Sequence, residues 1–168
     1  ASYNTAVGKS ALQENTTGTQ NVAVGYNTLD ANTTGNFNTS LGSQAGTANT
    51  TGAVNTAVGC VALAANTSGN YNTALAGNAL QNNTTGSNNT AIGYLSLNTN
   101  TTGQQNTGVG TSSLFSNSTG IYNVAVGTNT LANNTTADSN TAVGYSGLLS
   151  NTTGTNNTAV GGNSLDAN

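Results

Sequence analysis

Nine asparagines carry the one kind of chemistry that this sequence offers at a regular spacing. Each is followed two residues later by threonine or serine, with no proline between, which is the acceptor pattern for N-glycosylation. These candidate glycosylation sites are Asn15, Asn32, Asn49, Asn66, Asn83, Asn100, Asn117, Asn134 and Asn151. Consecutive sites lie 17 residues apart. A stacked array would therefore carry one acceptor in every repeat.

A second set of asparagines recurs with the same period and serves as an internal comparison. Its members are Asn4, Asn21, Asn38, Asn55, Asn72, Asn89, Asn106, Asn123, Asn140 and Asn157. Most are followed by Thr-Ala or Val-Ala, which is no acceptor pattern, and Asn38 matches it by accident. We interpret this set as a structural Asn ladder of stacked side-chain amides, as in cross-β assemblies.

The acceptor pattern also has a purely structural explanation. Asparagine, threonine and glycine are preferred corner residues because short polar side chains bond the local backbone. A repeated Asn-Thr-Thr-Gly corner would create acceptor patterns without any sugar. We favour the corner and keep glycosylation as the alternative. The two hydroxyls of the corner could also carry O-linked sugars, and the sequence does not distinguish them.

Composition argues against catalysis, metal binding and nucleic-acid binding. There is no histidine for acid–base chemistry, and the four carboxylates Glu14, Asp30, Asp138 and Asp166 cannot pair within one site. One lysine and no arginine cannot neutralise a phosphate backbone. No apolar run approaches a membrane span. We therefore expect no enzyme, no metal, no cofactor other than covalent glycans, and no membrane insertion.

A tandem repeat without insertions organises the whole chain. Counted from Asn4, the consensus is N-T-A-V-G-x-x-A-L-x-x-N-T-T-G-x-x, and Asn168 falls at its twelfth position. The 168 residues, 1-168, form a single repeat array with nine complete repeats and partial repeats at both ends. Fixed self-similarity of this kind is typical of stacked coils that pack only on their neighbours. Because both ends fall inside a repeat, we expect a window from a longer array.

The apolar and glycine positions predict an all-β fold. Position 4 is always a branched aliphatic residue and position 9 is leucine in nine of ten repeats, which suggests a thin core of two large side chains per repeat. Glycines at positions 5 and 15 supply the positive φ angles of two corners. Two short extended segments then fit one repeat. We predict a parallel β-solenoid, or β-roll, with strands about 4.8 Å apart.

Two large apolar residues per repeat are few for a free-standing rod. Assembly as a trimer or a polymer would supply the missing burial, so we expect self-association into a trimer or fibre. Cys60, the one cysteine, occupies position 6, where other repeats carry residues as different as Lys9 and Gly77. We expect this position to face solvent.

The elements Asn55 to Gly59 and Asn89 to Gly93 resemble the short N-[ST]-A-[VI]-G cores of YadA-like trimeric autotransporter head repeats. The full 17-residue form is similar to repeat arrays of bacterial and phage tail-fibre-like surface proteins. This resemblance covers the whole chain and implies an extracellular fibre, often trimeric, used for attachment. The longer period and the Asn-Thr-Thr-Gly corner depart from the head pattern.

These observations together predict a non-enzymatic structural fibre or adhesive stalk at a cell or virion surface, with a surface or glycan target. The alternative function is that of an ice-binding solenoid. Ice-binding faces need outward hydroxyls at i and i+2 of a strand. The invariant hydroxyls here, such as Thr16 and Thr17, are adjacent instead, so we place ice binding second.

Overall fold

The chain forms a rod of ten short parallel strands in one sheet, in a computed structural model that describes residues 1–166. The strands are β1 (Thr5–Val7), β2 (Val22–Val24), β3 (Thr39–Leu41), β4 (Thr56–Val58), β5 (Thr73–Leu75), β6 (Thr90–Ile92), β7 (Thr107–Val109), β8 (Val124–Val126), β9 (Thr141–Val143) and β10 (Thr158–Val160). Each pairs with its sequence neighbour, and Thr56 lies opposite Thr73. The predicted solenoid with a period of 17 residues is confirmed, and Asn168 lies outside the described residues.

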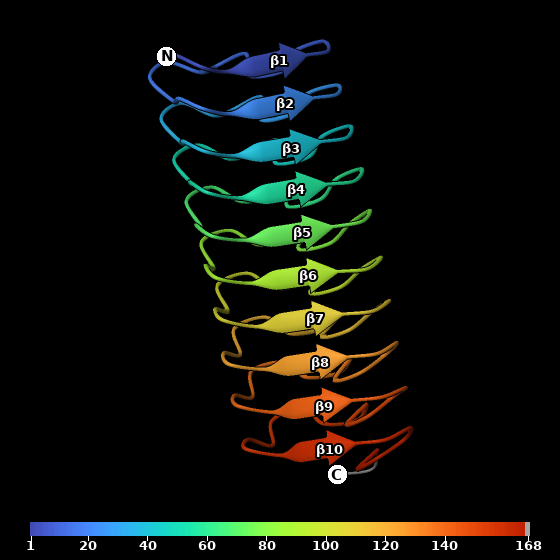
Figure 1. Ribbon diagram of the computed structural model, residues 1–168. Coiled ribbons are helices and arrows are strands. Elements are labelled where there is room, and N and C mark those ends of the chain that lie inside the picture. Colours follow the sequence, from blue (N-terminus) through green and yellow to red (C-terminus); the bar gives the residue numbers. More distant parts are fainter. Residues whose placement is uncertain (167–168) are drawn as a thin grey trace.

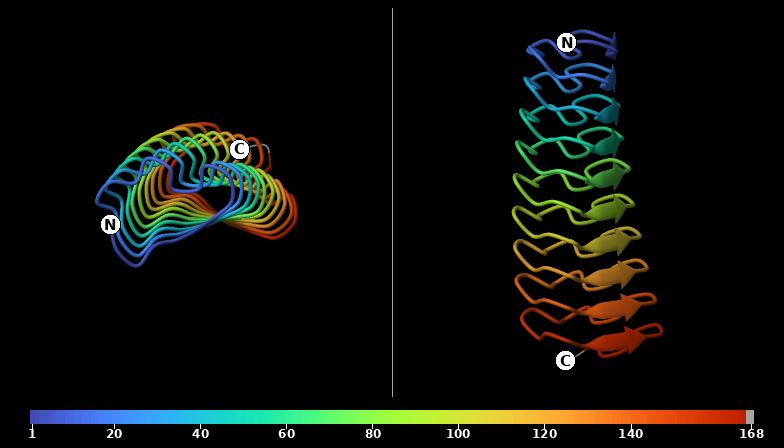
Figure 2. Two further views of the ribbon diagram at one scale, coloured as in Figure 1. Left: turned by 90° about the horizontal axis from the view of Figure 1, so that it is seen from above. Right: turned by 60° about the vertical axis from the view of Figure 1, so that its left-hand side comes forward.

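Figure 1 shows the strands stacked along the rod axis, each followed by a loop that returns to the next strand. Viewed along the axis, one repeat is a flattened, curved coil, which we call a rung (Figure 2). Each rung holds one strand of three residues, not the two extended segments that we predicted. Bends and turns form the rest of the rung. Glycine, asparagine and threonine favour such irregular backbone over a second strand.

The strands place alternate residues on opposite faces of the sheet. In β4, Ala57 is fully buried, whereas Thr56 and Val58 on either side are half-buried. The same alternation holds in the other strands apart from β1, so position 3 faces the core and positions 2 and 4 face outward. The strand residues are mostly threonine, alanine and valine, and the β-branched ones suit a half-buried pleated surface.

The core therefore differs from the predicted one. Position 4 was expected inside, but none of its ten residues is buried, and Val7 and Leu41 are about half exposed at 56% and 48%. The core consists of position 9 leucines, position 3 residues that are mostly alanine, and small residues at position 8. Small side chains at two positions let the two walls of the rung approach closely, and one leucine per rung fills the space that remains.

The corners depend on residues other than glycine. In the fourth rung, Val61, Leu63 and Tyr71 have φ of 60°, 53° and 59°, in the left-handed region. The same three positions, 7, 9 and 17, have positive φ throughout the rod. Side chains with a Cβ rarely adopt this conformation, and bulky ones least often. Our expectation that glycine supplies the positive φ angles is correct for position 5 but incomplete for the rung.

Burial explains how leucine tolerates this backbone. A left-handed residue costs about 1–2 kcal/mol, whereas complete burial of a leucine side chain contributes about 1.5–3 kcal/mol. Leu63 is 1% exposed, and its N–H donates to the Ala79 carbonyl of the next rung at 2.9 Å. The left-handed turn directs the side chain into the core while the backbone stays bonded between rungs.

The glycine at position 15 has a different role from the one predicted. Its φ is not in the left-handed region in any rung. Instead, a Cβ at Gly86 would clash with the Gly103 carbonyl oxygen of the next rung and with Asn83 Oδ1. The glycine therefore allows the backbone of the next rung and the side chain of Asn83 to approach closely. Ala137 is the one exception, and in its rung only Thr135 keeps the N–H bond to the Thr152 carbonyl.

The leucine column is interrupted once. Gly46 takes the place of leucine, and a Cβ there would lie 3.0 Å from both Leu29 Cδ2 and Ser40 Oγ. The buried apolar residues accordingly form two separate clusters. One contains Leu12 and Leu29, and the other begins at Ala45 and continues to the far end of the rod.

Restoring glycine at position 5 of the fifth rung should stabilise the rod. Ala76 has a φ of 118°, a conformation that is strained for a residue with a Cβ, and glycines hold this position in the other rungs. We expect Ala76→Gly to raise the free energy of unfolding by about 1 kcal/mol, because relief of strain exceeds the added entropy of the unfolded chain. Urea unfolding at equal protein concentration measures this change.

The reverse substitution provides the control. A Cβ at Gly93 would lie 2.6 Å from the Gly110 carbonyl oxygen, so Gly93→Ala should lower the free energy of unfolding. A loss of stability in Ala76→Gly would contradict this account of the corner.

Candidate functional site: the ladders and the outer sheet face

The first set of asparagines forms a buried ladder between side chains and backbone. Asn38 Nδ2 donates to the Gly52 carbonyl at 2.8 Å, and its Oδ1 accepts the Asn55 N–H at 2.9 Å. The same pair of bonds recurs from rung to rung. Members from Asn21 to Asn140 are buried, and Asn4 and Asn157 are half-buried. Each side chain therefore joins two rungs by bonds to the backbone.

The ladder of side-chain amides that we predicted for this set occurs mainly in the second set. Asn66 Nδ2 donates to Asn49 Oδ1 at 2.8 Å and to the Gly69 carbonyl at 3.1 Å. Both amide hydrogens are thereby used, and Asn66 Oδ1 accepts from Asn83 at 2.9 Å. The pattern repeats along the column from Asn32 to Asn151. In low-dielectric surroundings such bonds reinforce one another.

This geometry argues against the alternative that we kept open, an edge that carries N-linked sugars. The Asn32 to Asn151 side chains are at most 1% exposed, and Asn15 in the first rung is half-buried. A glycan would replace one hydrogen on Nδ2, but both hydrogens are bonded inside the rod. From Asn32 to Asn151 the folded rod does not present the acceptor atoms, because the same atoms hold the rungs together, whereas Asn15 Nδ2 donates only to the Gly18 carbonyl of its own rung. The corner explanation of Asn-Thr-Thr-Gly is the one that the contacts support.

The hydroxyl at position 13 belongs to the same network. Thr50 Oγ1 donates to the Thr67 carbonyl of the next rung at 2.9 Å, and Thr84 Oγ1 to Thr101 at 3.0 Å. The same carbonyl also accepts the N–H groups of the corner, as Thr67 does from Thr50 and Thr51 at 3.0 Å. Position 13 therefore contributes to stacking, and its hydroxyl is bonded in every rung from Thr16 to Thr135.

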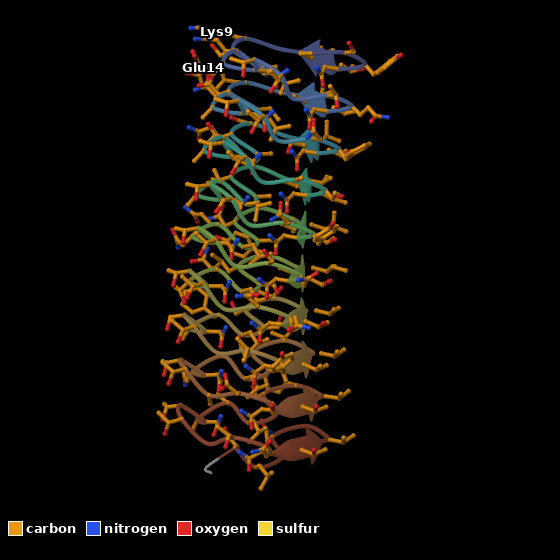
Figure 3. All side chains as sticks on the ribbon, turned by 90° about the vertical axis from the view of Figure 1, so that its left-hand side faces the viewer. Lys9 and Glu14 are labelled. Atoms are coloured by element: carbon orange, nitrogen blue, oxygen red, sulfur yellow. The ribbon has the colours of Figure 1, made fainter. Side chains whose placement is uncertain are left out.

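The outer face of the sheet carries two regular columns of side chains. Position 2 holds eight threonines and two valines, and position 4 holds ten branched aliphatic residues. Figure 3 shows side chains that project outward from the strands along the whole rod. We call position 4 the aliphatic stripe: Val7, Val24, Leu41, Val58, Leu75, Ile92, Val109, Val126, Val143 and Val160. It is a continuous apolar surface without charge.

The few reactive side chains are scattered. Lys9 Nζ lies 5.9 Å from the centroid of the Tyr26 ring, and Figure 3 shows Lys9 and Glu14 at the N-terminal end of the rod, on the side away from the strands. Asp138 Oδ1 accepts the Ile121 N–H at 2.7 Å, as Asn70 does for Ala53 in another rung. Cys60 is exposed, as predicted for position 6. The charged residues do not converge on one site.

The described part of the chain offers no enclosed site for a small molecule. Residues 1–166 contain neither a pocket nor a group of three or more His, Cys, Asp or Glu side chains able to hold a metal. They also lack a helix of the length and apolarity that a membrane span requires. Comparisons with protein-family models, curated proteins and solved structures gave no match. The surfaces of the rod are therefore the candidate functional sites.

Proposed function

We propose that this chain is a structural segment of an extracellular fibre or adhesive stalk, in which rods associate side by side through the aliphatic stripe. The observation that carries the proposal is that an outward-facing position, exposed in six rungs and half-buried in four, is apolar in all ten. Exposed position 6 varies among lysine, tyrosine, serine, cysteine, glycine and threonine. A position that faces solvent alone has no reason to stay apolar.

Strand propensity does not account for this regularity. Valine and isoleucine favour strands, but Leu41 and Leu75 are not β-branched and still occupy the stripe. Threonine, which is β-branched and common at position 2, never occurs at position 4. What the repeats retain is apolar surface, and burial against a second copy is a physical reason to retain it.

The available area supports association. Ten rungs at a spacing of about 4.8 Å give a face about 48 Å long. With side chains of positions 2 and 4 included, each rod offers on the order of 500 Å², and a pair buries on the order of 1,000 Å², near the lower limit for a specific interface. Neither position carries a charge in any rung, so no ion is desolvated when two faces meet.

Sedimentation analysis of the purified chain tests this proposal. We expect a particle mass that is a multiple of 16.5 kDa and a triple variant, Val58→Thr with Leu75→Thr and Ile92→Thr, that sediments as one chain. Threonine retains strand propensity, so the fold should persist in circular dichroism. Ile121→Thr, which lies outside the stripe, is the matched control and should leave the mass unchanged. A wild-type chain that remains a monomer up to millimolar concentration contradicts the proposal.

Ice binding is the second candidate, and one observation favours it. The structure places threonine and an aliphatic residue at i and i+2 on one outward face in eight of the ten strands, as in Thr73 and Leu75. This arrangement comes from positions 2 and 4, not from the adjacent hydroxyls at positions 13 and 14. Thermal hysteresis in a solution of monomeric rods would support ice binding. Associated rods without hysteresis would support the fibre.

A further inference from the structure

The column at position 14 holds a hydroxyl that the fold itself does not use. Its members are Thr17, Thr34, Thr51, Ser68, Thr85, Thr102, Thr119, Thr136 and Thr153. All nine are exposed, and no hydrogen bond of their side-chain oxygen occurs within residues 1–166. The neighbouring hydroxyl at position 13, by contrast, donates to the next rung. Two adjacent columns of the same residue type are thus chemically distinct.

Structure explains the constancy of position 13 but not that of position 14. Exposed positions without an internal role vary from rung to rung, as position 17 does among glutamine, phenylalanine, valine, tyrosine, asparagine and serine. Position 14 keeps a hydroxyl in nine of nine rungs, and the one change, to Ser68, removes the methyl group and keeps the oxygen. The retained property is therefore an accessible hydroxyl oxygen.

We propose that position 14 is a column of O-linked glycosylation sites. The buried amides of the second asparagine set cannot carry the sugars, whereas these hydroxyls are free nucleophiles at the surface. Threonine and serine are equivalent for such a linkage. The proposal concerns the coat of the rod and does not depend on association through the aliphatic stripe.

The chemistry of the linkage is a simple transfer. Oγ attacks the anomeric carbon of a nucleotide-activated sugar in a host transferase, and the bond from that carbon to the diphosphate oxygen breaks. The nucleoside diphosphate leaves, and the hydroxyl proton passes to a base of the transferase. Each rung gains one glycosidic bond without oxidation or reduction.

Charge and spacing favour sugars over phosphate. Nine phosphates at about 4.8 Å would repel one another strongly, and the chain offers one lysine and no arginine to neutralise them. A neutral sugar carries no such penalty. A hydrophilic coat would also hydrate a fibre of which only 3% of residues are charged.

Mass spectrometry of the protein made in its native host tests the proposal. We expect a mass above 16.5 kDa, loss of the excess on alkaline β-elimination, and peptide fragments that place the eliminated residues at position 14. A triple variant, Thr85→Val with Thr102→Val and Thr119→Val, should carry three fewer modified residues. The control Thr84→Val with Thr101→Val should keep them.

Three outcomes would overturn the proposal. They are a bare native chain, sugars located on position 13 or elsewhere, or phosphate in place of sugar. Circular dichroism of both variants shows whether the rod is folded. Mapping of the modified residues in the wild-type chain tests the proposal even if a variant fails to fold.

Discussion

Asn83→Asp is expected to destabilise the rod by about 3–5 kcal/mol at neutral pH, the range for an uncompensated buried charge. Asn83 Nδ2 donates to Asn66 Oδ1 and to the Gly86 carbonyl, both at 2.9 Å, and its Oδ1 accepts from Asn100 at 2.8 Å. A carboxylate there would lose both donors and face two acceptor oxygens. The side chain is fully buried, so water cannot replace the lost bonds.

The effect should depend on pH in a defined direction. Burial and neighbouring acceptors raise the pKa of the new carboxyl above its unfolded value of about 3.9. The folded state therefore binds more protons than the unfolded state, and stability falls as pH rises through and above that value. We expect Asn83→Asp to be relatively more stable near pH 3 than at pH 7. Urea unfolding at both pH values measures this.

Asn88→Asp is the matched control for this prediction. Asn88 is exposed, and its side chain makes no hydrogen bond in the described structure. Its φ of 60° suits aspartate as well as asparagine. We expect a change of less than about 0.5 kcal/mol. Equal losses in the two variants would mean that the second asparagine set does not form an internal ladder.

Leu97→Ala should cost about 2–5 kcal/mol, the usual range for a buried leucine. Leu97 is fully buried in the leucine column between Leu80 and Leu114. Its left-handed φ of 51° is maintained by the N–H bond to the Ser113 carbonyl at 2.9 Å, so alanine retains the strained backbone without the burial that offsets it. Thermal or urea unfolding at a concentration where rods are dissociated measures the loss.

Ile92→Ala separates the core from the aliphatic stripe. Ile92 is 38% exposed on the outer face, so its truncation should lower the unfolding free energy of the dissociated rod much less than Leu97→Ala. It should weaken association instead. If Ile92→Ala proves the more damaging to the isolated rod, then position 4 belongs to the core after all.

Periodicity alone was sufficient to predict the architecture. The invariant spacing of Asn55, Asn72 and Asn89 predicts stacked coils, and the β-branched residues beside small ones predict strands. The prediction of which strand face is buried was wrong, because a strand of three residues can bury either its middle residue or the two residues beside it. We placed Val58 and Leu75 in the core because their column is always aliphatic. The buried residues are instead Ala57 and Ala74.

The corners were the least predictable part. Propensity assigns positive φ to glycine, yet Leu63 and Tyr71 adopt it while Gly69 does not. Tertiary burial of leucine and close approach at glycine override the local preference. We also assigned the ladder of side-chain amides to the first asparagine set, although it occurs mainly in the second. Only the contacts show that the amide of the Asn-Thr-Thr-Gly corner points into the rod. One signal in the sequence was available: glycine at position 15 in eight of nine repeats implies a crowded corner, which is unsuited to a glycan.

Mass per unit length, measured by scanning transmission electron microscopy of unstained particles, tests the central claim most directly. One chain of 16.5 kDa over about 48 Å corresponds to about 3.4 kDa per nanometre. We predict straight rods with two or three times that value, as expected for solenoids joined side by side through the aliphatic stripe. Rods with the single-chain value, or compact particles without a long axis, would contradict the account.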